Sequence, residues 1–90
     1  MAIRRSKLEI IHDMLNSVQE KQGRIKPTHL LYKSNLSHKK LTEYLDDLLS
    51  KELLQRVDQN GYQYIILTDK GANFLFEFKR IKEFTESFGL

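Results

Sequence analysis

The sequence predicts an α+β fold made of a three-helix core, a β-hairpin and a long C-terminal helix. Two features predict it. Residues 34–37 read as a tight turn between two helical segments, and the second segment repeats apolar residues at the spacing of one helix face. Two strand-like segments follow, joined by Asn60-Gly61, the commonest residue pair of a two-residue hairpin turn. This order of elements is typical of a winged helix-turn-helix.

The length and composition describe one small domain. Ninety residues, 40% hydrophobic and 30% charged, are too few for two independent cores. We assign residues 1–71 to the winged helix-turn-helix and residues 72–90 to a C-terminal helix of the same structural unit. The longest strongly apolar run, residues 64–67, is far shorter than the ~20 residues of a membrane span, and the N-terminal segment lacks the apolar region of a signal peptide. We therefore expect a cytoplasmic protein that is not bound to a membrane.

The sequence offers little for catalysis or metal binding. It has no cysteine, and the spacings of His12, His29 and His38 match no standard zinc site. It also lacks a nucleophile elbow and a glycine-rich phosphate loop. We expect no metal, no cofactor and no enzymatic activity.

The first helix is predicted over about Ser6 to Gln22. Ser6 and Glu9 form an S-x-x-E capping box at its start. Gly23 accepts the left-handed backbone conformation with which many helices end. The residues between carry an apolar stripe at helical spacing, namely Leu8, Ile11, Met14, Leu15 and Val18.

The helix-turn-helix follows a short extended segment, Ile25-Lys26, which precedes Pro27. A short second helix is predicted over about residues 27–34. Ser37 is a suitable N-cap for the third helix, predicted over residues 37–51. Its inward face is the strongest pattern in the chain: Leu41, Tyr44, Leu45, Leu48 and Leu49.

The wing and the last helix complete the predicted fold. Strands are predicted over Leu53–Val57 and Tyr62–Leu67, and Asn60-Gly61 between them suits the positive φ of a tight turn. Thr68 is the predicted N-cap of the last helix. Apolar residues line that helix, namely Phe74, Leu75, Phe78, Ile81, Phe84 and Phe88.

Polar and basic residues gather at the front of the third helix: Ser37, His38, Lys39, Lys40 and Thr42. Positive charge at a helix N-terminus opposes the helix dipole, and local violations of this kind concentrate at functional sites. In a helix-turn-helix this end of the helix enters a DNA groove. We therefore expect these residues to contact phosphates or base edges, against the alternative of an ordinary solvated surface. The acidic rear of the helix is excluded from that contact.

Further residues offer contacts to the phosphate backbone, which position a protein on DNA without reading its sequence. They come from an N-terminal cluster and from the second helix: Arg4, Arg5, Lys7, Tyr32 and Lys33. The N-terminal cluster has an alternative as an ordinary charged tail, and Tyr32 has an alternative as a core residue. On the wing, Arg56 is the best candidate, since Asn60 and Gly61 are explained by turn geometry.

All five phenylalanines lie in the last helix. A helix of ~20 residues spans roughly 30 Å, which is more than a small domain can cover, so we expect its far end to be exposed. We expect this helix to hold a homodimer, through Phe74, Phe78, Ile81, Phe84 and Phe88. The alternative is that the stripe binds a different protein.

Three segments carry a resemblance to a known family. They are Asn35-Leu36-Ser37-x-x-x-Leu41-x-x-Tyr44-Leu45-x-x-Leu48, Leu53-Leu54 and Leu67-Thr68-Asp69-Lys70-Gly71. With them the chain resembles small archaeal winged helix-turn-helix DNA-binding proteins and predicted transcriptional regulators, which dimerise through a C-terminal helix as a coiled coil. The resemblance implies a DNA-reading third helix, a wing that contacts the DNA backbone and a twofold dimer.

Taken together, these features predict a protein that binds double-stranded DNA. The net charge of +3 permits binding to nucleic acid without establishing it. We expect a nucleoid-associated transcriptional regulator that acts as a homodimer with helix 37–51 in the major groove. The alternatives are a nonspecific DNA-coating protein, a protein-interaction domain that uses the phenylalanine stripe, and a binder of structured RNA.

Overall fold

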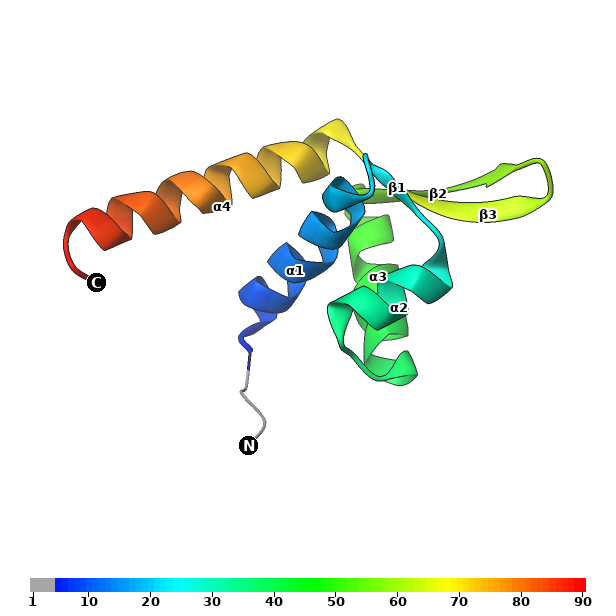
Figure 1. The fold of residues 1–90 in the computed structure, drawn as a ribbon, viewed down its shortest axis with the longest axis horizontal. Helices are drawn as coiled ribbons and strands as arrows, with labels where there is room; N and C mark the ends of the chain where they lie inside the picture. Colours follow the sequence, from blue (N-terminus) through cyan, green and yellow to red (C-terminus); the bar gives the residue numbers. More distant parts are fainter. Residues whose placement is uncertain (1–4) are drawn as a thin grey trace.

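The computed structural model describes residues 5–90, which form four helices and a three-stranded antiparallel sheet of order β1-β3-β2. The elements follow one another as α1 (Lys7–Glu20), β1 (Arg24–Ile25), α2 (Pro27–Ser34), α3 (His38–Ser50), β2 (Leu54–Gln59), β3 (Tyr62–Leu67) and α4 (Asp69–Ser87). The hairpin of β2 and β3 projects from one side of the first three helices, and α4 extends from the other side (Figure 1). The predicted winged helix fold is confirmed.

The core lies between the first three helices, the sheet and the start of α4. Every helix and strand contributes to its buried apolar side chains, which are Met14, Leu15, Val18, Ile25, Leu30, Leu41, Leu45, Leu48, Leu54, Ile65 and Leu75. The prediction that Leu8 belongs to the inward stripe is wrong, because its side chain is 52% exposed. The first turn of α1 lies at the end of that helix away from the sheet (Figure 1), so contact with the core begins only at Ile10.

Both ends of α1 have a local cause. The Ser6 hydroxyl accepts a hydrogen bond from the Glu9 amide, and the Glu9 carboxylate accepts one from the Ser6 amide, so the predicted capping box is confirmed. The hydrogen bond that the Glu9 carboxylate accepts from the Ser6 amide is the main cause that holds the pKa of this carboxyl below its ordinary value of 4.5. The helix ends at Glu20 instead of the predicted Gln22, because Gln22 already takes a positive φ of 62° and Gly23 follows with 86°.

The next segment differs from the prediction by one residue. β1 covers Arg24–Ile25, where Ile25-Lys26 was expected, and it pairs with the middle of β3. Lys26 instead directly precedes α2, whose first helical residue is Pro27. Proline is well suited to this place because the first amides of a helix have no partner within the helix.

The turn between α2 and α3 is set by two capping residues. Asn35 takes the left-handed conformation (φ 54°, ψ 43°) at the end of α2, and asparagine tolerates this conformation better than most residues. Ser37 caps α3, its hydroxyl accepting a hydrogen bond of 3.2 Å from the Lys40 amide, as predicted. The start of α3 is therefore fixed in place by the residues of the turn itself.

The wing is a hairpin with a two-residue turn. β2 covers Leu54–Gln59, where Leu53–Val57 was predicted, and pairing continues up to Gln59 opposite Tyr62. Only Asn60-Gly61 remain outside the pairing, with positive φ values of 52° and 80°. The predicted Asn-Gly turn is confirmed.

The two faces of the wing carry different residues. Partners directly opposite one another share a face, and successive residues alternate between faces. Ile65 is buried, so it and its partner Arg56 lie on the inner face, which is turned toward the helices. Tyr62 and Tyr64 consequently lie on the outer face.

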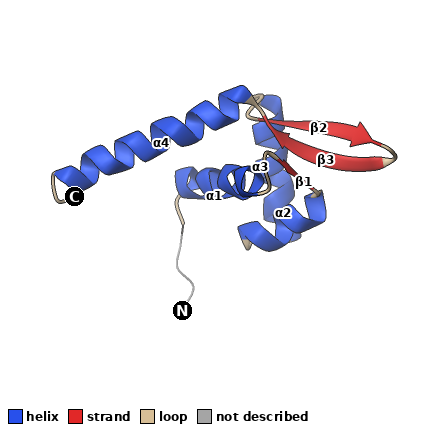
Figure 2. Cartoon of the chain, turned by 45° about the horizontal axis from the view of Figure 1, so that its top comes forward, coloured by secondary structure: helices blue, strands red, loops and turns tan. Residues whose placement is uncertain are grey.

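α4 has a packed beginning and a projecting end. The Thr68 hydroxyl caps it by accepting a hydrogen bond of 3.0 Å from the amide of Gly71, and both Gly71 and Leu75 are buried. The far half of the helix, orange to red in Figure 1, runs clear of the sheet and the other helices (Figures 1 and 2). Among residues 5–90, no helix has the length and apolar character needed to cross a membrane.

Candidate nucleic-acid interface

α2, α3 and the inner face of the wing enclose a crevice of about 260 Å³. Its lining residues come from all three elements: Pro27, Thr28, Leu31, His38, Leu41, Thr42, Leu45, Asp46, Arg56 and Gln63. The crevice brings together the front of the third helix and the wing arginine, which the sequence suggested separately. Among these lining residues Thr42, Asp46 and Arg56 are exposed to solvent.

The front of α3 is exposed at His38, Lys39 and Lys40. Lys39 has no acidic partner within 4.0 Å among the described residues, and Lys40 makes only a long contact of 3.9 Å with Glu43. The Thr42 hydroxyl donates to the His38 carbonyl oxygen at 2.9 Å, which leaves its oxygen able to accept one more hydrogen bond. Two cations and an imidazole are therefore presented to solvent at the front of α3, and of these three residues His38 lines the crevice.

The rear of α3 is acidic, and one carboxylate lies closer to the interface than expected. Asp46 lines the crevice together with Thr42 and Arg56. The exclusion of the acidic rear from contact with DNA stays a prediction. The position of Asp46 follows from helical spacing, since residues four apart lie on the same side of a helix. At the next residue, a hydrogen bond from Lys51, one turn farther along, holds the pKa of Asp47 below its ordinary value of 3.8. Asp47 consequently keeps its negative charge at neutral pH.

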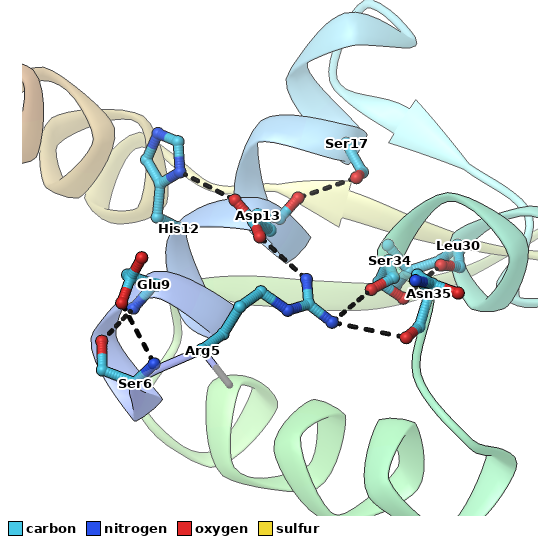
Figure 3. A network of polar contacts seen from close by, with 9 residues as sticks. All are labelled: Arg5, Ser6, Glu9, His12, Asp13, Ser17, Leu30, Ser34 and Asn35. Carbon is cyan, nitrogen blue, oxygen red and sulfur yellow. Dashed lines mark hydrogen bonds and ion pairs between the residues drawn. The ribbon is translucent and has the colours of Figure 1, made fainter. Parts of the chain in front are cut away.

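The structure places Arg5 inside a network of polar contacts at the helix-turn-helix (Figure 3). Its guanidinium lies 2.8 Å from the Asp13 carboxylate and donates to the Ser34 carbonyl oxygen at 2.9 Å. Asp13 also lies 3.2 Å from the ring nitrogen of His12. The donors of Arg5 are therefore used within the protein, where an exposed phosphate contact was expected. Arg4, the other arginine of the predicted cluster, lies outside the described residues.

The remaining predicted contacts differ in how freely they are exposed. Tyr32 is 83% exposed, so the alternative that it belongs to the core is wrong. Lys33 makes an ion pair of 3.0 Å with Glu20 of α1. Lys7 is exposed and lines a hollow beside α3 that also includes Lys40.

The phenylalanines of α4 fall into two groups. Phe74 packs against the core, and Phe78 stacks on His12 of α1 with 4.4 Å between ring centroids. Farther along, Ile81 is 65% exposed, Phe84 67% and Phe88 68%. The first group holds α4 to its own domain, so the second group is free for a partner, and Phe76, 59% exposed, lies apart from both groups.

One basic surface was not found from the sequence. Lys21, Arg24 and Lys26 line a hollow with His29 and Tyr64 at the edge of the sheet. The signal was present as three cations within six residues, but they follow a helix end, a turn and a strand, so no single periodic pattern groups them. The three cations and Tyr64 lie close together because β1 pairs with β3.

Comparison with known proteins agrees with this geometry. A family model described as winged helix-turn-helix matches residues 4–86 of the chain. No curated protein matches it in sequence.

Several solved structures share the fold. Sso10a-2, a DNA-binding protein from Sulfolobus solfataricus, superposes with a TM-score of 0.77 at 20% identity, over 93% of this chain and 85% of that one. F93 from STIV, a winged-helix DNA-binding protein, gives 0.70 at 15% identity, over 89% and 92% of the two chains. A MarR family transcriptional regulator from Silicibacter pomeroyi gives 0.73 at 20% identity, over 86% of this chain. This chain spans only 53% of that regulator's length.

Proposed function

Because this chain belongs to the winged helix-turn-helix family, we propose that it binds double-stranded DNA with α3 in the major groove. The observation that carries the proposal is the front of α3, where His38, Lys39 and Lys40 are exposed and His38 lines a crevice together with Arg56 of the wing. The DNA-binding proteins Sso10a-2 and F93 have the same fold, which supports this assignment.

The contacts divide by their chemistry. Lys39 and Lys40 sit at the leading end of α3, and Lys7 and Arg56 flank them, so these cations are suited to phosphates. Ser37, His38 and Thr42 carry groups that can donate to or accept from base edges. The hydroxyl of Tyr32, which is exposed on α2, can donate a hydrogen bond to a phosphate of the DNA backbone. Few groups therefore read bases, and many hold the backbone.

The proposed assembly is a homodimer through the projecting end of α4. Ile81, Phe84 and Phe88 form its exposed apolar stripe, and the rings of Phe84 and Phe88 pack together at 5.1 Å. An exposed apolar stripe of this kind is suited to association with a second copy of the same helix.

Within this proposal, a regulator and a nonspecific coat differ in specificity alone. A dimer that makes about 6–8 phosphate contacts gives a slope near −5 to −7 when log K is plotted against log salt concentration. Titration of the protein with labelled duplex at several salt concentrations tests the proposal, and a slope near zero would contradict it.

Selection of bound sites from a random duplex pool then separates the two roles. An enriched motif indicates a regulator, and no enrichment indicates a coat.

A further inference from the structure

A second positively charged surface lies on the outer face of the sheet, outside the interface described above. Lys21, Arg24 and Lys26 line it, together with His29 and Tyr64. The hollow they surround has a volume of about 470 Å³. Figure 1 shows the strands that carry these residues, with β1 running alongside the base of the wing before α2 begins.

Two of these cations are stacked on tyrosines. The Arg24 guanidinium lies 4.5 Å from the centroid of the Tyr64 ring, and the Lys26 ammonium lies 5.0 Å from that of Tyr62. Arg24 also donates a hydrogen bond to the Gln59 side chain on β2. Stacking of a cation on an aromatic face is attractive and restricts its motion. The two long side chains are therefore held over the sheet with hydrogen-bond donors still free.

The charge of this surface is not neutralised by the protein. Lys21, Arg24 and Lys26 have no carboxylate within 4.0 Å among residues 5–90, a property that they share with Lys7, Lys39, Arg56, Lys70 and Lys82. No acidic residue lines the hollow. The three cations carry as much charge as the formal net charge of the whole chain, +3. An uncompensated basic surface of this kind attracts polyanions.

From these observations we infer that the outer face of the sheet is a second site for the phosphodiester backbone of duplex DNA. A cation lies over one face of each tyrosine ring and keeps free hydrogen-bond donors, so the surface is suited to phosphates. It faces away from Arg56 and the crevice, because Tyr64 and Arg56 lie on opposite faces of the wing. The backbone it holds belongs either to DNA that curves around the wing or to a second duplex. This inference rests on the proposed function.

The test compares a double variant with a matched control. Arg24→Ala with Lys26→Ala removes two cations from this surface, and Lys79→Ala with Lys82→Ala removes two exposed cations from α4. Binding to a duplex of about 30 base pairs, three turns of the helix, is measured as a function of salt. Capture of a second, labelled duplex by protein already bound to an immobilised one is measured in parallel. Arg24→Lys with Lys26→Arg keeps the charge and should behave like the natural protein.

Two outcomes support the inference. A salt slope smaller by about 2 per protomer in the Arg24/Lys26 variant indicates that a single duplex reaches both sites. If the salt slope is unchanged but the variant no longer captures the second, labelled duplex, the surface holds a second duplex. If both measurements match those of the α4 control, the inference is wrong. If the natural protein binds no duplex at low salt, the proposed function itself fails, which is a different result.

Discussion

The guanidinium of Arg5 lies 2.8 Å from the carboxylate of Asp13, and its other nitrogen donates a hydrogen bond to the Ser34 carbonyl at the end of α2. Figure 3 shows how this one side chain joins the first helix to the helix-turn-helix. It occupies carbonyl groups that α2 leaves unpaired at its C-terminus. Arg5 is therefore expected to matter for stability more than for direct contact with DNA.

Arg5→Ala should lower the free energy of unfolding by about 1–2 kcal/mol, since charge-assisted hydrogen bonds are lost. Denaturation by urea, followed by circular dichroism, measures this change. Lys7→Ala is the matched control, because Lys7 is exposed and has no acidic partner within 4.0 Å among residues 5–90. Equal stability of the two variants would show that the network of Figure 3 contributes nothing measurable.

Gly71→Ala should destabilise the fold, although Gly71 lies in a helix where alanine is normally favoured. A Cβ at this position would overlap the Leu53 carbonyl oxygen and lie 2.7 Å from the Leu67 side chain. Overpacking of this kind costs about 1–3 kcal/mol. Asn73→Ala, exposed on the same helix, is the control in thermal denaturation. A melting temperature for Gly71→Ala at or above that of the natural chain would contradict the close packing of α4 on Leu53.

Asp46→Asn should strengthen DNA binding about two- to fivefold at low salt. Asp46 lines the crevice beside Arg56, so its negative charge repels an approaching phosphate backbone. The gain should shrink as salt rises, because screening weakens the repulsion. Glu83→Gln on α4 removes a negative charge far from the crevice and serves as the control in the same titration. Weaker binding by Asp46→Asn would indicate instead that Asp46 accepts a hydrogen bond from a base.

Phe84→Ser combined with Phe88→Ser should convert a dimer into a monomer, because both rings belong to the exposed stripe of α4. Sedimentation equilibrium measures the mass directly. Phe76→Ser is the comparison variant: Phe76 is also exposed, at 59%, but it lies outside the stripe and packs near Arg80. If the natural chain sediments as a monomer, the proposed dimer is wrong and the stripe is available to another protein.

The elements that the sequence predicted best are those with a local cause. Ser6, Ser37 and Thr68 each cap a helix through an amide three residues away, and Asn60-Gly61 supply their own turn conformation. Such signals lie within a few neighbouring residues, so they can be interpreted without knowledge of the fold.

The site was harder to predict because its groups meet across the fold. Arg5 reaches Ser34, 29 residues away, and nothing near Arg5 in the sequence indicates that its donors are taken. Arg24 meets Tyr64 only because β1 pairs with β3. Asp46 could be assigned to an exposed face, but whether that face lies toward the wing depends on the packing of α3 against β2. The charge pattern correctly predicted that the front of α3 is exposed. It did not show that Asp46 lines a crevice beside that end of the helix.

Removal of the two lysines at the front of α3 tests the central claim most directly. Lys39→Ala with Lys40→Ala should lower affinity for duplex DNA at least about tenfold at moderate salt and reduce the salt slope by about 2 per protomer. The melting temperature should stay unchanged or rise slightly, since both side chains are exposed and their charges oppose the helix dipole. The Lys79→Ala and Lys82→Ala variant, which loses the same charge from α4, should bind like the natural protein. Equal affinity of the two variants for DNA would contradict the assignment of α3 as the helix that enters the groove.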